Sequence, residues 1–282
     1  MRNFTFKGLF LAAMFMVLGS LAIQAADNDG LITKQITVKL DKAGTLPDKI
    51  GSTKKKQITN LKIIGEINGT DWCFIREMAG SDYNCEKTGG KLSMLDLSDA
   101  KIVKGGLPYI KYMGGVYTSN DKLGYAAFSG CSGLTSLTIP SSVTSIGESV
   151  FFGCSGLTSF TIPSSVTSIG WGAFCGCSGL TSIYVYTEKL PNMGSDVFAG
   201  CDAKKCTVYV PKGTYDDYWI SEFGYFENIV EFDPTGINNV ITSNDTKELS
   251  RYSLNGQRLS APTKGLNIVK YSDGSVKKVA VQ

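Results

Sequence analysis

Cysteine is the residue type in this sequence whose spacing most invites a chemical role. Four cysteines recur at nearly fixed intervals: Cys131, Cys154, Cys177 and Cys201. If the repeats stack like neighbouring strands, equivalent residues lie about 5 Å apart, so the four sulfurs span roughly 15 Å. Zinc instead needs its thiolate ligands at about 2.3 Å from one point. The column therefore predicts neither a metal site nor disulfides between neighbours, and we expect buried thiols that act as small apolar side chains.

Catalytic chemistry has little support elsewhere in the sequence. The chain has no histidine, which removes histidine-based triads, imidazole ligands and the commonest general base. Acidic pairs such as Asp216–Asp217 are available for glycoside hydrolysis, but no pattern places two carboxylates across a cleft. P-loop, nucleophile-elbow and dinucleotide motifs do not occur. We expect a protein without enzymatic activity, metal or cofactor, and a carbohydrate-active enzyme is the least favoured alternative.

The first 25 residues have the order of a secretory signal peptide. Arg2 and Lys7 precede an apolar run from Leu9 to Leu18, and the small-residue sequence AIQAAD follows. Cleavage after Ala25 or Ala26 removes two positive charges, so the formal net charge falls from +3 to +1. We expect a secreted or cell-surface protein, on the outside of a bacterium, with no membrane span after cleavage. A chain so close to neutral does not predict a nucleic-acid partner.

Two further cysteines lie outside the regular column. Cys73 falls in a segment with a helical pattern, and Cys85 falls in the loop that follows it. Export permits disulfides. We expect Cys73 and Cys85 to pair and to fasten the helix to its loop.

A 23-residue repeat organises the middle of the chain. The stretch GCSGLTSLTIPSSVTSIG, which begins at Gly130, returns as GCSGLTSFTIPSSVTSIG from Gly153 and begins again at Gly176. Apolar residues recur in columns, among them Phe128, Phe151, Phe174 and Phe198, and Leu134, Leu157 and Leu180. A fixed period with apolar columns is typical of a solenoid, whose coils bury their apolar residues by stacking on their neighbours.

Each repeat also contains a short predicted strand. In LTSLTIP, Leu137 and Ile139 point inward and Thr138 outward, and Pro140 ends the strand. ITNLKI and LSMLDL extend the pattern upstream, and CTVYVP is the expected final strand. The solenoid is therefore predicted over residues 58–232, with an N-terminal cap over 27–57.

The repeat resembles the BspA-type leucine-rich repeat of bacterial surface proteins, on the pattern F-x-G-C-S-G-L-T-S-L-T-I-P-S-S-V-T-S-I-G. The stretch CTVYVPKGTYDDYW is similar to the terminal coil of that family. The resemblance implies a curved, β-dominated α/β horseshoe with a concave sheet, used for adhesion or ligand binding. We expect an adhesin-like protein whose concave face binds a protein or glycan ligand at the cell surface. A self-associating structural component of the cell envelope is the alternative.

The outward column of the predicted strands supplies the candidate binding residues. It reads Lys62, Asp96, Thr138, Thr161, Tyr184 and Tyr209. Serine and threonine are also ordinary solvated strand residues, whereas exposed tyrosines depart from the repeat. Neighbouring tyrosine rings offer flat apolar area with hydroxyl groups, suited to a sugar or a peptide. We expect ligand binding at Tyr184 and Tyr209, with Thr138, Thr161 and Asp96 beside them.

Two interruptions of the repeat carry further candidates. A tyrosine-rich stretch over residues 101–126 is the second choice for ligand binding, through Tyr109, Tyr112 and Tyr117. The alternative is that these rings pack over an irregular coil. The earlier stretch NGTDWCFIREMAG predicts a short helix with Thr70 as its N-cap. Its core-facing residues are expected to be Trp72, Ile75 and Met78 or Ala79.

The end of the chain differs in composition. Residues 233–250 are polar and predict a linker, and residues 251–282 contain six Lys or Arg against one acid. Three short strands are expected there, with turns at Asn255–Gly256 and Asp273–Gly274. This small β module resembles the C-terminal sorting domain of type IX-secreted proteins. A structural β-cap is the alternative.

Overall fold

The structure is a computed structural model that describes residues 30–112, 114–234, 248–253, 258–259, 261–262, 264–271 and 276–281. The expected signal peptide lies outside these residues, and so do the expected turns at Asn255–Gly256 and Asp273–Gly274. Among the described residues, none of the helices has the length and apolar character that a membrane crossing requires.

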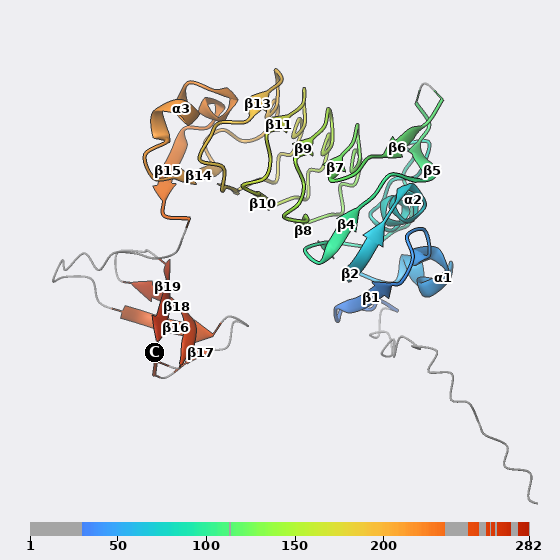
Figure 1. The fold of residues 1–282 in the computed structure, drawn as a ribbon, viewed down its shortest axis with the longest axis horizontal. Helices are drawn as coiled ribbons and strands as arrows, with labels where there is room; N and C mark the ends of the chain where they lie inside the picture. The colour runs from blue at the N-terminus through green and yellow to red at the C-terminus, as the bar shows by residue number, and fades with distance from the viewer. Residues whose placement is uncertain are drawn as a thin grey trace, which may run out of the picture.

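Most of the described chain forms a β-rich repeat solenoid, in which the coils follow one another side by side (Figure 1). Parallel strands build its main sheet in the order β1-β2-β3-β8-β10-β12-β14-β15, and β4 also pairs with β2. These strands are β1 (Ile36–Leu40), β2 (Asn60–Ile67), β3 (Met94–Asp96), β4 (Ala100–Ile102), β8 (Ser136–Thr138), β10 (Ser159–Ile162), β12 (Ser182–Val185), β14 (Thr207–Pro211) and β15 (Asn228–Phe232).

A second parallel sheet lies in stretches where no strand was predicted from the sequence. It has the order β13-β11-β9-β7 and is formed by β7 (Lys122–Leu123), β9 (Ser145–Ile146), β11 (Ser168–Ile169) and β13 (Asn192–Met193). Ile146 pairs with Ile169, and both side chains are buried. Each SSVTSIG segment therefore adds a two-residue strand on the opposite side of the core.

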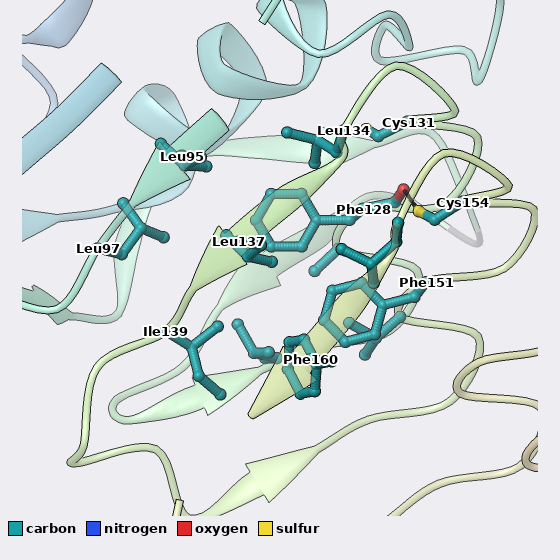
Figure 2. Close-up of a cluster of buried hydrophobic side chains, with 14 of the residues drawn as sticks. Leu95, Leu97, Phe128, Cys131, Leu134, Leu137, Ile139, Phe151, Cys154 and Phe160 are labelled. Carbon is teal, nitrogen blue, oxygen red and sulfur yellow. Dashed lines mark hydrogen bonds between the residues drawn. The ribbon is translucent and has the colours of Figure 1, made fainter. Parts of the chain in front are cut away.

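Phenylalanine rings stack along the core between the two sheets. Phe151 lies 5.7 Å from Phe128 and 4.9 Å from Phe174, measured between ring centroids, and Phe174 lies 5.6 Å from Phe198. Figure 2 shows Phe128, Phe151 and Phe160 gathered in this core. Trp72 packs on Phe128 at one end of the row. The repeat thus places one buried aromatic ring in every coil, as its columns predicted.

The cysteine column is buried, which confirms the expectation of apolar thiols. Three of its four thiols also donate a hydrogen bond to the phenylalanine carbonyl one coil back: Cys154 to Phe128 (3.1 Å), Cys177 to Phe151 (3.1 Å) and Cys201 to Phe174 (3.4 Å). The first of these bonds is drawn in Figure 2. Within the described residues, no group of His, Cys, Asp or Glu side chains is arranged to hold a metal ion. A small side chain with a weak donor fits this position because it satisfies a buried carbonyl.

These buried thiols predict a loss of stability in alkali. Burial raises the pKa of Cys131 from 9.0 to about 12, and burial likewise raises those of Cys201 and Cys206 to about 12. Since the folded state binds these protons more tightly than the unfolded state, the contribution is complete below about pH 9 and is lost toward pH 12. We expect the urea midpoint to be lower at about pH 10.5 than at about pH 7.5. Cys131→Ala should make the midpoint less sensitive to pH, and a midpoint that stays constant over this range would contradict the prediction.

The predicted disulfide between Cys73 and Cys85 is wrong, because all eight cysteines are free thiols. Cys73 is half-buried on helix α2 (Gly69–Met78), and burial followed by the charge of Glu77 raises its pKa. The sulfur of Cys85 lies instead 3.8 Å from Nη2 of Arg76. The same nitrogen donates to the carbonyl of Ser129, so the loop is folded toward the repeat coil rather than toward Cys73.

Helix α2 forms where the sequence predicts it, but its N-cap is Asn68 and not Thr70. The Asn68 side chain accepts from the Thr70 amide, and Asp71 accepts from the Asn68 amide, which is a capping box. Thr70 uses its hydroxyl to accept from the Leu107 amide. Trp72 and Ile75 are buried as expected, and so are both alternatives for the third core residue, Met78 and Ala79. Short helical segments α1 (Leu46–Ile50) and η1 (Lys54–Lys56) precede β2.

The C-terminal end of the solenoid lies at the predicted residue 232 but contains one more strand than predicted. After β14, the chain forms α3 (Tyr215–Trp219) and η2 (Glu222–Tyr225) and then returns as β15 beside β14. β14 is therefore not the final strand. A separate antiparallel sheet in the order β17-β16-β18-β19 contains β16 (Glu248–Ser253), β17 (Arg258–Leu259), β18 (Gly265–Tyr271) and β19 (Val276–Val281). It has four strands rather than three, and β16 begins inside the predicted linker.

Candidate functional site

The predicted binding column forms one row on the face of the main sheet that points away from the core, here called the outward face. The pairing places Lys62 beside Asp96, and Asp96 beside Thr138. Further along, Thr161 lies beside Tyr184, and Tyr184 beside Tyr209. The row continues to Val230 on β15. The structure thus brings the predicted outward residues together across successive strands, which confirms the predicted register.

The N-terminal part of the outward face is occupied by an ion-pair cluster. Nζ of Lys62 lies 3.1 Å from Oδ2 of Asp96 and 2.7 Å from Oδ2 of Asp99. Hydrogen bonds to Asp99 and Asp96 raise the pKa of Lys62. Burial pushes the pKa of Asp96 upward, but hydrogen bonds from Ser98 and Lys62 outweigh it and lower the pKa. Asp96 is thus held in an ion pair, and the strands β8 and β10 separate it from the tyrosines.

The C-terminal part of the outward face is aromatic. The rings of Tyr184 and Tyr209 stack face to face, with centroids 4.6 Å apart and an interplanar angle of 6°. Phe232 lies edge-on to Tyr184 and to Tyr186. Burial and the neighbouring Tyr209 raise the pKa of Tyr184, while the Ser182 hydroxyl acts in the opposite direction. The two tyrosines are neighbours, as predicted, but they do not form a flat platform because each covers one face of the other.

The hydroxyl groups of this sheet fall into two kinds that the sequence does not distinguish. Thr135, Thr158 and Thr181 each donate to a carbonyl one coil back, at 3.0 Å in every case. These threonines fasten adjacent coils. Thr138 and Thr161 are exposed, and their hydroxyls make no hydrogen bond to another described residue. Only the second kind still has its donor, as well as its lone pairs, available for a ligand.

The tyrosine-rich stretch over residues 101–126, the second choice for ligand binding, also contains both buried and exposed candidates. It contains a two-stranded hairpin of β5 (Gly105–Ile110) and β6 (Val116–Thr118). Tyr109 is 1% exposed, packs on Trp72, and donates from its hydroxyl to the carbonyl of Tyr125. The prediction that Tyr109 contacts a ligand is therefore wrong, because its ring belongs to the core. Tyr112 and Tyr117 are 46% and 51% exposed, so they stay available.

Two aromatic residues of the outward face were not predicted from the sequence. Tyr186 continues the alternation of Tyr184 beyond the end of β12, and this spacing was a usable signal. Phe232 lies on β15, which is not part of the repeat, so no column pointed to it. Together they extend the aromatic part of the face beyond the stacked pair.

The fold and the face define a class of protein: a β-rich repeat solenoid with a largely uncharged outward face. A comparison with protein families supports the resemblance found in the sequence. Residues 116–217 match the model of the BspA type Leucine rich repeat region, in six copies. This segment includes β8, β10, β12 and β14, so Thr138, Thr161, Tyr184 and Tyr209 all lie within it. A comparison with curated proteins found no match.

Proposed function

We propose that this protein is exported and acts without catalysis as an adhesin-like repeat protein. In this proposal, the outward face around Tyr184 and Tyr209 binds a protein or glycan ligand at the bacterial cell surface or outside the cell. The observation that carries the proposal is the stacked tyrosine pair on the side of the sheet away from the core. The two preceding coils have threonine at the same outward position, Thr138 and Thr161, so the fold itself does not require these rings.

The chemistry of the outward face favours binding over catalysis. The face offers aromatic surface and hydroxyl groups, which supply contact area and hydrogen bonds. Asp96, the carboxylate in the predicted row, is held in the ion pair with Lys62. Paired carboxylates across a substrate are what glycoside hydrolysis needs. The arrangement is that of a recognition surface.

A second candidate function, self-association in the envelope, is favoured by the end of the main sheet. β15 is the last strand in the sheet order and pairs only with β14 within the described part of the chain. Val230 on this strand is 45% exposed. An uncovered edge strand can add a strand from another copy. Light scattering of the mature protein tests this, and a concentration-dependent rise in mass that Val230→Lys abolishes would favour the scaffold.

The binding proposal predicts the behaviour of the double variant Tyr184→Ala/Tyr209→Ala. Because both rings lie outside the core, their removal should cost only about 1 kcal/mol, the scale of one aromatic pair. Binding in an array of glycans and matrix proteins should weaken at least tenfold, roughly 1.4 kcal/mol. The matched control is Tyr112→Ala/Tyr117→Ala in the hairpin, which should bind normally. If only the hairpin variant loses binding, the outward face is not the site.

A further inference from the structure

The outward side chains of the last five strands carry no charge. Along β8, β10, β12, β14 and β15, these positions hold only serine, threonine, tyrosine, proline, asparagine, valine and phenylalanine. The row reaches charged residues only at β3 and β2, where Lys62 forms ion pairs with Asp96 and Asp99. A charged ligand is attracted and oriented by opposite charge. The face therefore complements an uncharged ligand.

One aromatic surface on this face has no aromatic partner. Tyr184 is covered on one side by Tyr209, which belongs to the following strand. On its other side the neighbouring outward residue is Thr161 of β10, and Thr138 of β8 comes next. Threonine is much smaller than tyrosine, so the row steps down from a ring to two short hydroxyl side chains. The second face of the Tyr184 ring therefore borders the hydroxyl groups of these two threonines.

The two threonines beside Tyr184, Thr161 and Thr138, have unused hydrogen-bonding capacity. Each threonine hydroxyl is one donor and accepts through two lone pairs. The hydroxyls of Thr138 and Thr161 are not engaged with any other residue that the structure describes. By contrast, Thr158 of the same coil uses its hydroxyl to bind the carbonyl of Thr135. The free hydroxyls thus lie beside the open ring face, and the engaged ones support the coil.

We infer that the outward face binds an uncharged glycan, with a pyranose ring stacked on the free face of Tyr184 and its hydroxyls bound to Thr161 and Thr138. A pyranose complements both the aromatic ring face and the threonine hydroxyls, since one side of the sugar ring presents C–H groups and its rim carries hydroxyls. Aromatic side chains provide the apolar contact, and a few placed polar groups fix the orientation. This inference rests on the proposed function and specifies its ligand.

Affinity electrophoresis of the mature protein in gels that contain a polysaccharide tests the inference. The neutral probes are dextran, mannan and galactan, and the charged comparators are heparin and polygalacturonate. We expect at least one neutral probe to retard the protein, with little change between about 0.05 M and 0.5 M salt, because no charges are paired. Retardation by the charged probes alone, or retardation that salt abolishes, would overturn the inference.

Two substitutions at one position locate the bound sugar. Thr161→Tyr extends the stack and covers the free face of Tyr184, so retardation by the neutral probe should fall at least tenfold while Tyr184 is still present. Thr161→Val removes only the hydroxyl and should weaken retardation by about threefold to tenfold, the scale of one hydrogen bond. The control is Thr158→Val, which removes an engaged hydroxyl of the same coil and should leave retardation unchanged. Equal effects of Thr161→Val and Thr158→Val would overturn the assignment of Thr161.

The outcomes separate this inference from the proposed function. If no neutral probe binds, but a matrix protein binds and Tyr184→Ala/Tyr209→Ala weakens it, the glycan assignment fails and the binding face stands. If the double variant changes the binding of neither polysaccharides nor proteins, both fail. If a neutral probe binds and responds to Thr161→Tyr, both are supported.

Discussion

Replacement of Phe151 by alanine is expected to lower the free energy of unfolding by about 3–5 kcal/mol. The ring is buried between Phe128 and Phe174 in the stacked row and also contacts Phe160. Its removal leaves a cavity in the middle of the solenoid, where the parallel strands of both sheets hold the walls apart. Urea unfolding followed by circular dichroism measures the loss.

The adjacent residue provides a matched control. Phe152 is the next residue of the same coil, but its side chain is 46% exposed. Phe152→Ala removes the same number of atoms and should change stability by no more than about 0.5 kcal/mol. Similar losses from both variants would show that the row of rings is not the main support of these coils.

The effect should also extend along the chain, because the coils contact mainly their neighbours. In such an architecture, stability is close to a sum of the coils and the interfaces between them. Phe151 contributes to the interfaces on both of its sides, through Phe128 and Phe174. Hydrogen exchange should therefore report lost protection first in the coils of β8, β10 and β12.

The sequence predicted the main sheet because its signal is repeated. Leu137 and Phe160 occupy one column, and both are buried on neighbouring strands. The second sheet was missed because a strand of two residues, such as Ser145–Ile146, is too short to show an alternating pattern. β15 was missed because Asn228–Phe232 is not a copy of the repeat, although it pairs in register with β14.

The candidate site was predicted correctly only within the repeat, where the strand pattern fixes the direction in which each side chain points. Alternation placed Tyr184 and Tyr209 on the outward face, and the constant offset of the coils placed them side by side. Irregular segments have no such rule. The burial of Tyr109 depends on the position of Trp72 in a separate helix, and the position of the Cys85 sulfur depends on the path of a loop. Sequence spacing specifies neither of these contacts.

Arg76 joins that irregular segment to the regular coils, and its removal is the second large effect that we expect. The side chain is fully buried. Nη1 donates to the carbonyls of Ala126 (2.8 Å) and Ala127 (3.0 Å), and Nη2 donates to the hydroxyl of Ser81 (3.0 Å). Its bonding partners in the described chain are all uncharged. The guanidinium thus connects helix α2 to the coil that begins the stacked row.

Arg76→Met is expected to lower the free energy of unfolding by about 2–4 kcal/mol. Methionine keeps the apolar stem but leaves buried acceptors without their charged donor, and hydrogen bonds to charged groups contribute about 1.5–3 kcal/mol each. Relief from burying an unpaired charge offsets part of this loss. Lys101→Met is the control: Lys101 is 59% exposed and lies 4.0 Å from Glu66, so its loss should cost less than about 1 kcal/mol. Chemical denaturation gives both values. If Arg76→Met is as stable as the control, α2 is held to the solenoid by apolar packing alone, through Trp72, Ile75 and Met78.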